Sequence, residues 1–172
     1  LLASPYGKIP GGIARWTGHI IKYYEQEGKS DCEMDLLPMG RSTFVNTHSS
    51  FFSRIKSALK DYSIILKEYK QKLKEKQYDI VHVVSSASIS LLKDLYMLRL
   101  AKRFKTCAIV HFRFGRIPQL KEQNNWEWKL LCRVVREADK VVVIDSDTLK
   151  DQWDKAHVSV LQMNSNYLVK WL

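Results

Sequence analysis

Short apolar runs rich in β-branched residues alternate along this chain with longer stretches in which apolar residues recur every three or four positions. The first pattern predicts buried strands, and the second predicts amphipathic helices. The expected strands are Leu1–Ser4, a short segment within Cys32–Leu37, Tyr78–Val84, Thr106–Phe112, a run from Lys140 and a last one near Val158–Leu161. The expected helices are Gly12–Glu27, Ser50–Gln77, Ala87–Arg103, one around Trp126–Glu137 and a short one at Asp147–Asp154, with a loop over 115–125.

This alternation predicts an α/β fold of the Rossmann-like, three-layer kind, in which an open and mostly parallel sheet carries helices on both faces. A length of 172 residues corresponds to about one domain. No run approaches the roughly 20 apolar residues of a membrane-spanning helix, and the start lacks the pattern of a signal peptide. We therefore expect a soluble or peripheral protein.

The balance of 28 Lys and Arg against 18 Asp and Glu gives a net charge of +10. Such an excess implies an acidic partner, either nucleic acid, an anionic membrane surface or a phosphate-bearing ligand. Charge alone does not choose among these. The three cysteines, Cys32, Cys107 and Cys132, are far apart and form no CxxC pair, which is typical of reduced thiols in a cytoplasmic protein.

A pair of glycines, Gly11 and Gly12, follows the first expected strand and opens the first expected helix. In parallel sheets, ligands bind beyond the carboxyl ends of the strands, where glycine lets the backbone approach a phosphate and a helix N-terminus supplies positive potential. A pyrophosphate site is therefore one interpretation, and a simple tight turn is the other. The surrounding GKIPGGIA matches neither GxGxxG nor a Walker A loop.

Three segments together resemble one protein family. They are SPYGKIPGGIARWT (Ser4–Thr17), the run from YDIVHVV to HFRFG (Tyr78–Gly115) and EADKVVVIDSDTLKDQW (Glu137–Trp153). In this order they are similar to the retaining GT-B glycosyltransferases of family 4. The resemblance implies that residues 1–172 are a single Rossmann-like N-terminal domain on the acceptor side, and that the donor-binding C-terminal domain, with its paired glutamates, is absent from this chain.

The end of the chain, VLQMNSNYLVKWL, resembles the segment in which the family crosses to its second domain. Asn164 stands at the place of an asparagine often found there, and Met163 replaces the proline that usually precedes it. The resemblance implies transfer of a hexose from a nucleotide sugar to a polysaccharide or lipid-linked acceptor with retention. It implies no protein nucleophile, cofactor or metal, and little activity in the isolated domain. The enzyme would be cytoplasmic or peripheral at the inner face of the membrane.

The resemblance also assigns site residues. Gly11 and Gly12 match a glycine loop that approaches the donor diphosphate, and His111 matches a histidine close to the transferred sugar, which makes it the expected catalytic residue. Arg113 stands where the family often has a second histidine. Because arginine presents a fixed fork of donors, this replacement suggests an anionic group on the acceptor.

Three further residues are expected to bind the acceptor, and each has a simpler explanation as well. Arg15 lies in the first turn of the helix after the glycines, where a surface salt bridge would also explain it. Arg116 lies in the loop after His111 and is equally consistent with solvent exposure. Ser86 follows the strand Tyr78–Val84 and is also suited to be the N-cap of the next helix.

Asp145-Ser146-Asp147 resembles the metal-binding DxD of another glycosyltransferase fold. In this position a strand end followed by a helix cap explains it better, and we predict no metal site.

The longest expected helix carries a stripe of lysines, Lys56, Lys60, Lys67 and Lys74, with Asp61, Glu68 and Glu75 on the other flank. The stripe suits an anionic membrane surface, to which each lysine would contribute about 1 kcal/mol. A solvated helix face is the alternative.

Two functions remain open. The favoured one is the acceptor-binding half of a glycosyltransferase, including a split enzyme whose donor half is a separate polypeptide. The alternative is a stand-alone basic α/β module for a phosphorylated ligand or nucleic acid. Aromatic and basic side chains interleaved on an exposed strand face would favour that module. The strands are instead apolar, so we expect no nucleic-acid partner.

Overall fold

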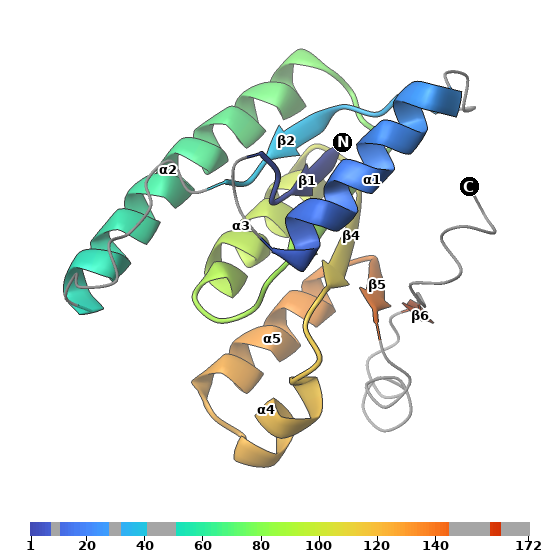
Figure 1. Ribbon diagram of the computed structural model, residues 1–172. Helices are drawn as coiled ribbons and strands as arrows, with labels where there is room; N and C mark the ends of the chain where they lie inside the picture. Colours follow the sequence, from blue (N-terminus) through green and yellow to red (C-terminus); the bar gives the residue numbers. More distant parts are fainter. Residues whose placement is uncertain (8–10, 28–31, 41–50, 145–158, 163–172) are drawn as a thin grey trace.

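The computed structural model describes residues 1–7, 11–27, 32–40, 51–144 and 159–162, and the side chains of these residues except 27, 51–58 and 159–162. Figure 1 shows the elements along the chain. The strands are β1 (Leu2–Ser4), β2 (Leu36–Pro38), β3 (Ile80–Ser85), β4 (Cys107–Phe112), β5 (Lys140–Val143) and β6 (Ser159–Gln162). The helices are α1 (Gly12–Glu27), α2 (Phe51–Glu75), α3 (Ser90–Arg103), α4 (Ile117–Gln123) and α5 (Trp126–Glu137).

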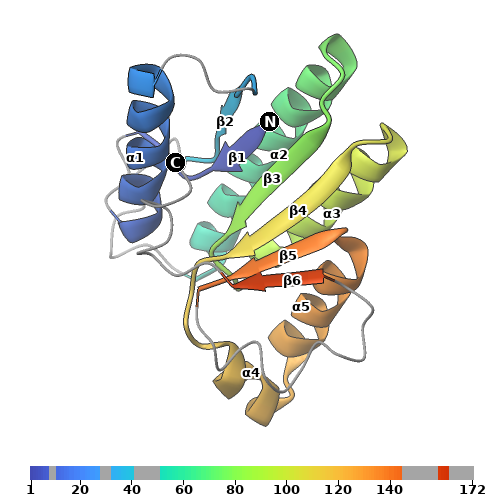
Figure 2. The same cartoon turned by 90° about the vertical axis from the view of Figure 1, so that its right-hand side faces the viewer.

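The strands form one sheet in the order β2-β1-β3-β4-β5-β6, and every neighbouring pair is parallel (Figure 2). The chain runs outward from β1 to β2 and then returns past β1 to β3. The direction of winding therefore reverses between β1 and β3. In open parallel sheets the carboxyl ends of the strands at such a reversal border the ligand site.

The helices lie on both faces of the sheet. Among the described elements, α1 covers one face, and α2, α3 and α5 cover the other (Figures 1 and 2). Right-handed crossovers explain this division, because α1 leads from β1 in one direction along the sheet and the later helices lead in the opposite direction. A hydrogen bond of 2.6 Å between the hydroxyls of Ser4 and Thr17 joins β1 to α1.

The main core lies between the sheet and α2, α3 and α5. Ala3, Val83, Val110 and Val141 occupy matching register positions on four neighbouring strands, and each is completely buried. They share one apolar cluster with residues of the three helices, among them Tyr69, Leu98 and Leu131. The opposite faces of β3 and β4 carry His82 and His111, whose rings lie beside Trp16 of α1.

The α/β fold with a parallel sheet is confirmed. One expectation was wrong: the segment 115–125 is not all loop, because α4 forms within it. Pro118 occupies the first turn of this helix, where its missing N–H costs no hydrogen bond, and Ile117 and Leu120 are buried. Burial of these two side chains stabilises a helix that is too short to be recognised from the sequence pattern.

The boundaries and faces of two helices also differ from expectation. α3 begins at Ser90 and not at Ala87, because Ala87 and Ser88 have positive φ angles of 68° and 61°. On α2, Ile65, Tyr69 and Leu73 are buried, whereas Leu59 is 51% exposed. The apolar repeat of the sequence predicts a buried face formed by Leu59, Tyr62, Leu66, Tyr69 and Leu73, and only part of that face is buried. The helix expected at Asp147–Asp154 lies outside the described residues.

Candidate functional site

The glycine pair lies at the carboxyl end of β1, beside the reversal in strand order. Gly11 has a φ of +151°, which side chains with a Cβ rarely adopt, and Gly12 begins α1. A Cβ placed on either residue would meet no atom within 4 Å. The backbone conformation at position 11 therefore requires glycine. Gly12 instead leaves open space in front of the first turn of the helix. An anion fits this combination of free space and helix N-terminus.

A histidine pair lies under α1 on the neighbouring strands β3 and β4. The Nε2 atom of His82 lies 3.3 Å from the Nδ1 atom of His111. Trp16 of α1 covers the pair, with its ring edge-to-face to His111 at 5.2 Å between centroids. The guanidinium of Arg113 stacks over the Trp16 ring at 4.7 Å. The structure thus brings together the predicted residues His111 and Arg113 through the indole of Trp16.

Burial controls the charge of this pair. His111 is completely buried, and desolvation, reinforced by the charges of His82 and Arg113, lowers its pKa to about 2. Burial likewise lowers the pKa of His82 to about 4. Both imidazoles are therefore neutral near pH 7, so each ring has one nitrogen that donates and one that accepts. Such a pair can orient a hydroxyl group, but it brings no positive charge to a phosphate.

Two buried polar atoms in this cluster have no hydrogen-bond partner among the described residues: Nε2 of His111 and Nε1 of Trp16. Unpartnered buried polar atoms are costly and rare in folded proteins. His111 itself has no exposed surface in this structure. Its expected catalytic role stays a prediction, which would require Trp16 and α1 to admit a substrate group.

Glu127 fastens the loops that follow β3 and β4. It lies in the first turn of α5, whose N-cap Asn125 accepts a hydrogen bond from the Trp128 amide. One carboxylate oxygen of Glu127 accepts from the Ser88 amide at 2.7 Å and from the Arg116 guanidinium at 2.6 Å. The first hydrogen bond stabilises the left-handed backbone at Ser88. The second pairs the Arg116 guanidinium with a carboxylate.

The other predicted acceptor residues are placed differently. Arg15 is exposed on the first turn of α1, beside the glycine pair. Ser86 is exposed at the end of β3, and it is not the N-cap of α3, because that position is Ile89 and carries no side-chain cap. The structure thus places Arg15 and Ser86 at the carboxyl edge of the sheet, and their ligand contacts stay predictions.

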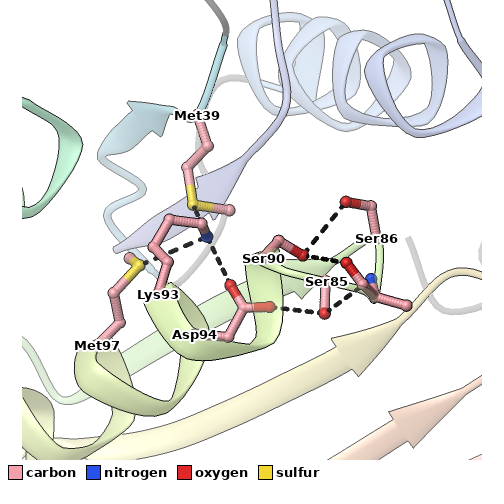
Figure 3. A network of polar contacts seen from close by, with 8 residues as sticks. Met39, Ser85, Ser86, Ser90, Lys93, Asp94 and Met97 are labelled. Carbon is pink, nitrogen blue, oxygen red and sulfur yellow. Dashed lines mark hydrogen bonds and ion pairs between the residues drawn. The ribbon is translucent and has the colours of Figure 1, made fainter. Parts of the chain in front are cut away.

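A pocket of about 100 Å³ opens at the same edge of the sheet. Its walls come from the loops after β1 and β2, from the end of β3, and from α2 and α3; the lining residues are Pro5, Met39, Gly40, Asp61, Tyr62, Ile65, Val84, Ser86, Ser90 and Lys93. Lys93 and its neighbour Asp94 are 6% and 0% exposed and form an ion pair of 2.5 Å. Figure 3 shows this pair beside Ser85, Ser86 and Ser90.

The parallel α/β fold agrees with the result of comparison with known proteins. Residues 10–159 match the family model described as Glycosyltransferase Family 4. The chain belongs to this family. Comparison with curated proteins and with solved structures gives no match. Because the match covers most of the chain, this Glycosyltransferase Family 4 domain acts in sugar transfer, with a sugar donor and an acceptor as its general partners.

The lysine stripe of this family 4 domain lies on the side of α2 that faces away from the sheet. Lys60, Lys67 and Lys74 are exposed, and the side chain of Lys56 lies outside the described residues. In the part of the chain that the structure describes, no helix is both long enough and apolar enough to cross a membrane.

No group of three His, Cys, Asp or Glu suited to a metal ion occurs within the described ranges. Asp145-Ser146-Asp147, which resembles a metal-binding motif, lies outside them.

Sequence reasoning missed several residues at this edge of the family 4 domain: Trp16, His82, Lys93, Asp94 and Glu127. One signal was available for Asp94, because a carboxylate in the middle of the apolar run SLLKDLYML is unusual for a buried helix. Glu127 resembles any acidic residue in a first helical turn. Its two partners are supplied by other loops, so no local pattern identifies it.

Proposed function

We propose that this domain forms the acceptor side of a retaining hexosyltransferase, which moves a sugar from a nucleotide-sugar donor to a polysaccharide or lipid-linked acceptor. The observation that carries the proposal is the open backbone at Gly11–Gly12. A phosphate needs close backbone approach and positive potential, and the free space at the first turn of α1 offers both. The diphosphate of the donor would lie there.

The acceptor would bind along the carboxyl edge of the sheet, between α1 and the loops after β3 and β4. Within the described residues, Arg113 and Arg15 lie at this edge without a carboxylate partner, and they would bind an anionic group. His111 would orient a hydroxyl as a neutral imidazole. The donor-binding domain that the family resemblance implies would supply most contacts to the nucleotide.

Peripheral attachment to the inner face of the membrane is part of the proposal. The exposed lysines of α2 form one stripe on a helix whose opposite side is buried against the core. Such a stripe lies parallel to the helix axis and suits a flat anionic surface.

Gly12→Ala tests the diphosphate site. The added methyl group projects into space that no protein atom occupies, so the fold should keep its thermal stability, whereas a bound phosphate would be displaced. We expect sugar transfer to fall on the order of 100-fold. The measurement is incorporation of label from UDP-, GDP- and dTDP-sugars in extracts of cells that lack the native gene and carry a wild-type or variant copy of it.

Gly18→Ala is the matched control, because it adds the same methyl group to the same helix away from the glycine turn, at ordinary contact distance from Tyr6. It should transfer sugar like the wild type. Equal sugar transfer by Gly12→Ala and the wild type would contradict a diphosphate site at Gly12. No incorporation from any labelled nucleotide sugar would contradict the proposed reaction itself.

A further inference from the structure

The pocket beside Lys93 borders a buried ion pair, which is costly in free energy. Lys93, which lines the pocket, forms an ion pair with its neighbour Asp94, and both are almost completely buried. Taking two charges out of water costs free energy that their attraction repays only in part, and apolar replacements of similar volume are often equally stable or more stable. Fold stability alone therefore gives a weak reason for Lys93 and Asp94, whereas a binding role gives a direct one.

The two members of the pair are satisfied to different degrees. Asp94 accepts from Lys93 through one oxygen and from the Ser85 hydroxyl, at 2.6 Å, through the other. The remaining polar contacts of Lys93 are with the sulfur atoms of Met39 at 3.1 Å and Met97 at 3.8 Å (Figure 3). Thioether sulfur is a weak acceptor. An oxygen atom that enters the pocket beside Met39 would be a better partner for the ammonium.

Hydroxyl groups complete the polar lining. Ser90 donates its hydroxyl proton to the Ala87 carbonyl at 2.6 Å, so its oxygen retains lone pairs for an incoming donor. The Ser86 oxygen lies 3.5 Å from the Ser90 oxygen on the same side of the pocket. The pocket thus offers a donor at Lys93 and acceptors at the serines. A ligand hydroxyl can use both kinds of contact, because it donates and accepts.

The charges of the pocket favour a neutral ligand. Asp94 already neutralises Lys93, so the buried ammonium brings no net positive charge to the pocket. A phosphate or carboxylate beside Lys93 would place a second negative charge close to the Asp94 carboxylate in a poorly solvated place. A neutral ring that carries several hydroxyl groups meets no such repulsion, and Tyr62 and Ile65 offer it apolar surface.

We infer that this pocket binds a neutral hydroxylated sugar ring of the acceptor, with Lys93 as the residue that selects a hydroxyl group. The inference rests on the proposed function, because it names the part of the acceptor that this edge of the domain recognises. An anionic acceptor group would then lie elsewhere, near Arg113 and Arg15. The pocket would bind the neutral sugar ring, and the two arginines would bind the anionic group.

Direct binding tests the inference without any sugar transfer. The ¹⁵N-labelled 172-residue chain is titrated with D-glucose, D-galactose, D-mannose or N-acetyl-D-glucosamine, and separately with inorganic phosphate, and the amide signals of Ser86, Ser90 and Lys93 are followed. We expect saturable shifts of these signals with at least one of the sugars and none with phosphate. Because no nucleotide sugar is present, the result is independent of the donor site at Gly12.

The decisive variant removes both charges together. Lys93→Met alone would leave the Asp94 carboxylate buried without its countercharge, so Lys93→Met is combined with Asp94→Asn, whose amide oxygen still accepts from Ser85. Binding of the sugar should weaken about tenfold or more, while the thermal unfolding temperature is maintained. Lys102→Met, at an exposed lysine of the same helix, is the matched control and should bind the sugar like the wild type.

A second variant keeps the test decisive if the double variant unfolds. Ser86→Phe fills the mouth of the pocket from an exposed position and does not touch the ion pair, and it should also abolish the sugar-dependent shifts. Three results would overturn the inference: phosphate saturating the same amides, no sugar shifting them, or undiminished sugar binding by these variants. None of them would affect the outcome of the Gly12→Ala experiment.

Discussion

Several residues at the carboxyl edge of the sheet have an unfavourable environment or backbone conformation. His111 is a polar side chain without exposed surface, and Ala87 and Ser88 hold left-handed backbone without being glycines. Strained backbone and unpartnered polar atoms tend to gather at sites that bind or react. In this domain the unpartnered Nε2 atom of His111 on β4 and the left-handed residues Ala87 and Ser88 after β3 lie on neighbouring strands or directly after them.

The buried histidines make stability depend on pH. The pKa of His111 is lower in the folded chain than its usual value near 6.5 in the unfolded chain, so the unfolded state binds more protons as the pH falls. The stability contributed by the neutral form is fully present above about pH 6.5 and is lost below it. We expect His111 to account for a loss of about 2 kcal/mol between pH 7 and pH 5.

Urea unfolding of the wild type and of His111→Gln at the two pH values measures this loss. The variant should lose about 2 kcal/mol less than the wild type on acidification. His19→Gln replaces an exposed histidine on α1 and controls for the removal of an imidazole as such. Identical pH dependence in the wild type and His111→Gln would show that His111 is not held neutral in the folded chain.

At the scale of elements, α2 has two chemically different sides. Ile65, Tyr69 and Leu73 are buried against the core, and the Tyr69 hydroxyl donates to the Met97 carbonyl of α3 at 3.0 Å. Lys60, Lys67 and Lys74 are on the exposed side. The buried contacts fix the orientation of the helix, and this orientation determines what the lysines can face.

Replacing Lys56, Lys60, Lys67 and Lys74 with Gln tests the membrane contact. If the stripe faces anionic lipid, each lysine contributes about 1 kcal/mol, so sedimentation with phosphatidylserine vesicles at low salt should weaken on the order of 100-fold or more. Replacing Lys102, Lys105, Lys121 and Lys129, which are also exposed, removes the same charge from other elements and is the control. If the two sets of replacements weaken vesicle binding equally, the stripe is a solvated helix face that contributes only to the net charge.

At the scale of the whole molecule, the proposed site lies at one edge of the domain. The glycine turn, the lysine pocket and the Glu127 contact all lie where the strands end, with the reversal between β1 and β3 among them. A site at an edge is open toward a second body. This arrangement is consistent with a donor-binding domain that closes over the carboxyl ends of the strands.

Residues 1–172 alone should therefore transfer almost no sugar. The family resemblance implies that a donor-binding domain supplies most contacts to the nucleotide, and without those contacts the loss of positioning removes most of the rate. Purified residues 1–172 are incubated with labelled nucleotide sugars and an acceptor extract, and an extract of wild-type cells serves as the positive control. Turnover by residues 1–172 comparable to that of the wild-type extract would contradict the proposal that a separate domain supplies most contacts to the donor.

Much of the architecture could be predicted from local patterns. α1 spans Gly12–Glu27 as expected from its apolar periodicity and the glycines that flank it, and β4 differs from expectation by one residue. α4 could not be predicted, because a seven-residue helix containing proline depends on burying Ile117 and Leu120 in a core formed by other elements. The start of α3 was misplaced because Glu127, which is far away in the chain, holds Ser88 in left-handed backbone.

The sequence by itself determined the α/β class, the glycine turn and the family, because periodicity, backbone requirements and ordered motifs are properties of consecutive residues. The tertiary structure alone decided which side chains meet. His82 and His111 are 29 residues apart, Ser88 and Glu127 are 39 apart, and Met39 and Lys93 are 54 apart. Strand order and helix packing bring these pairs together, and both follow from burial of the whole core rather than from any local pattern.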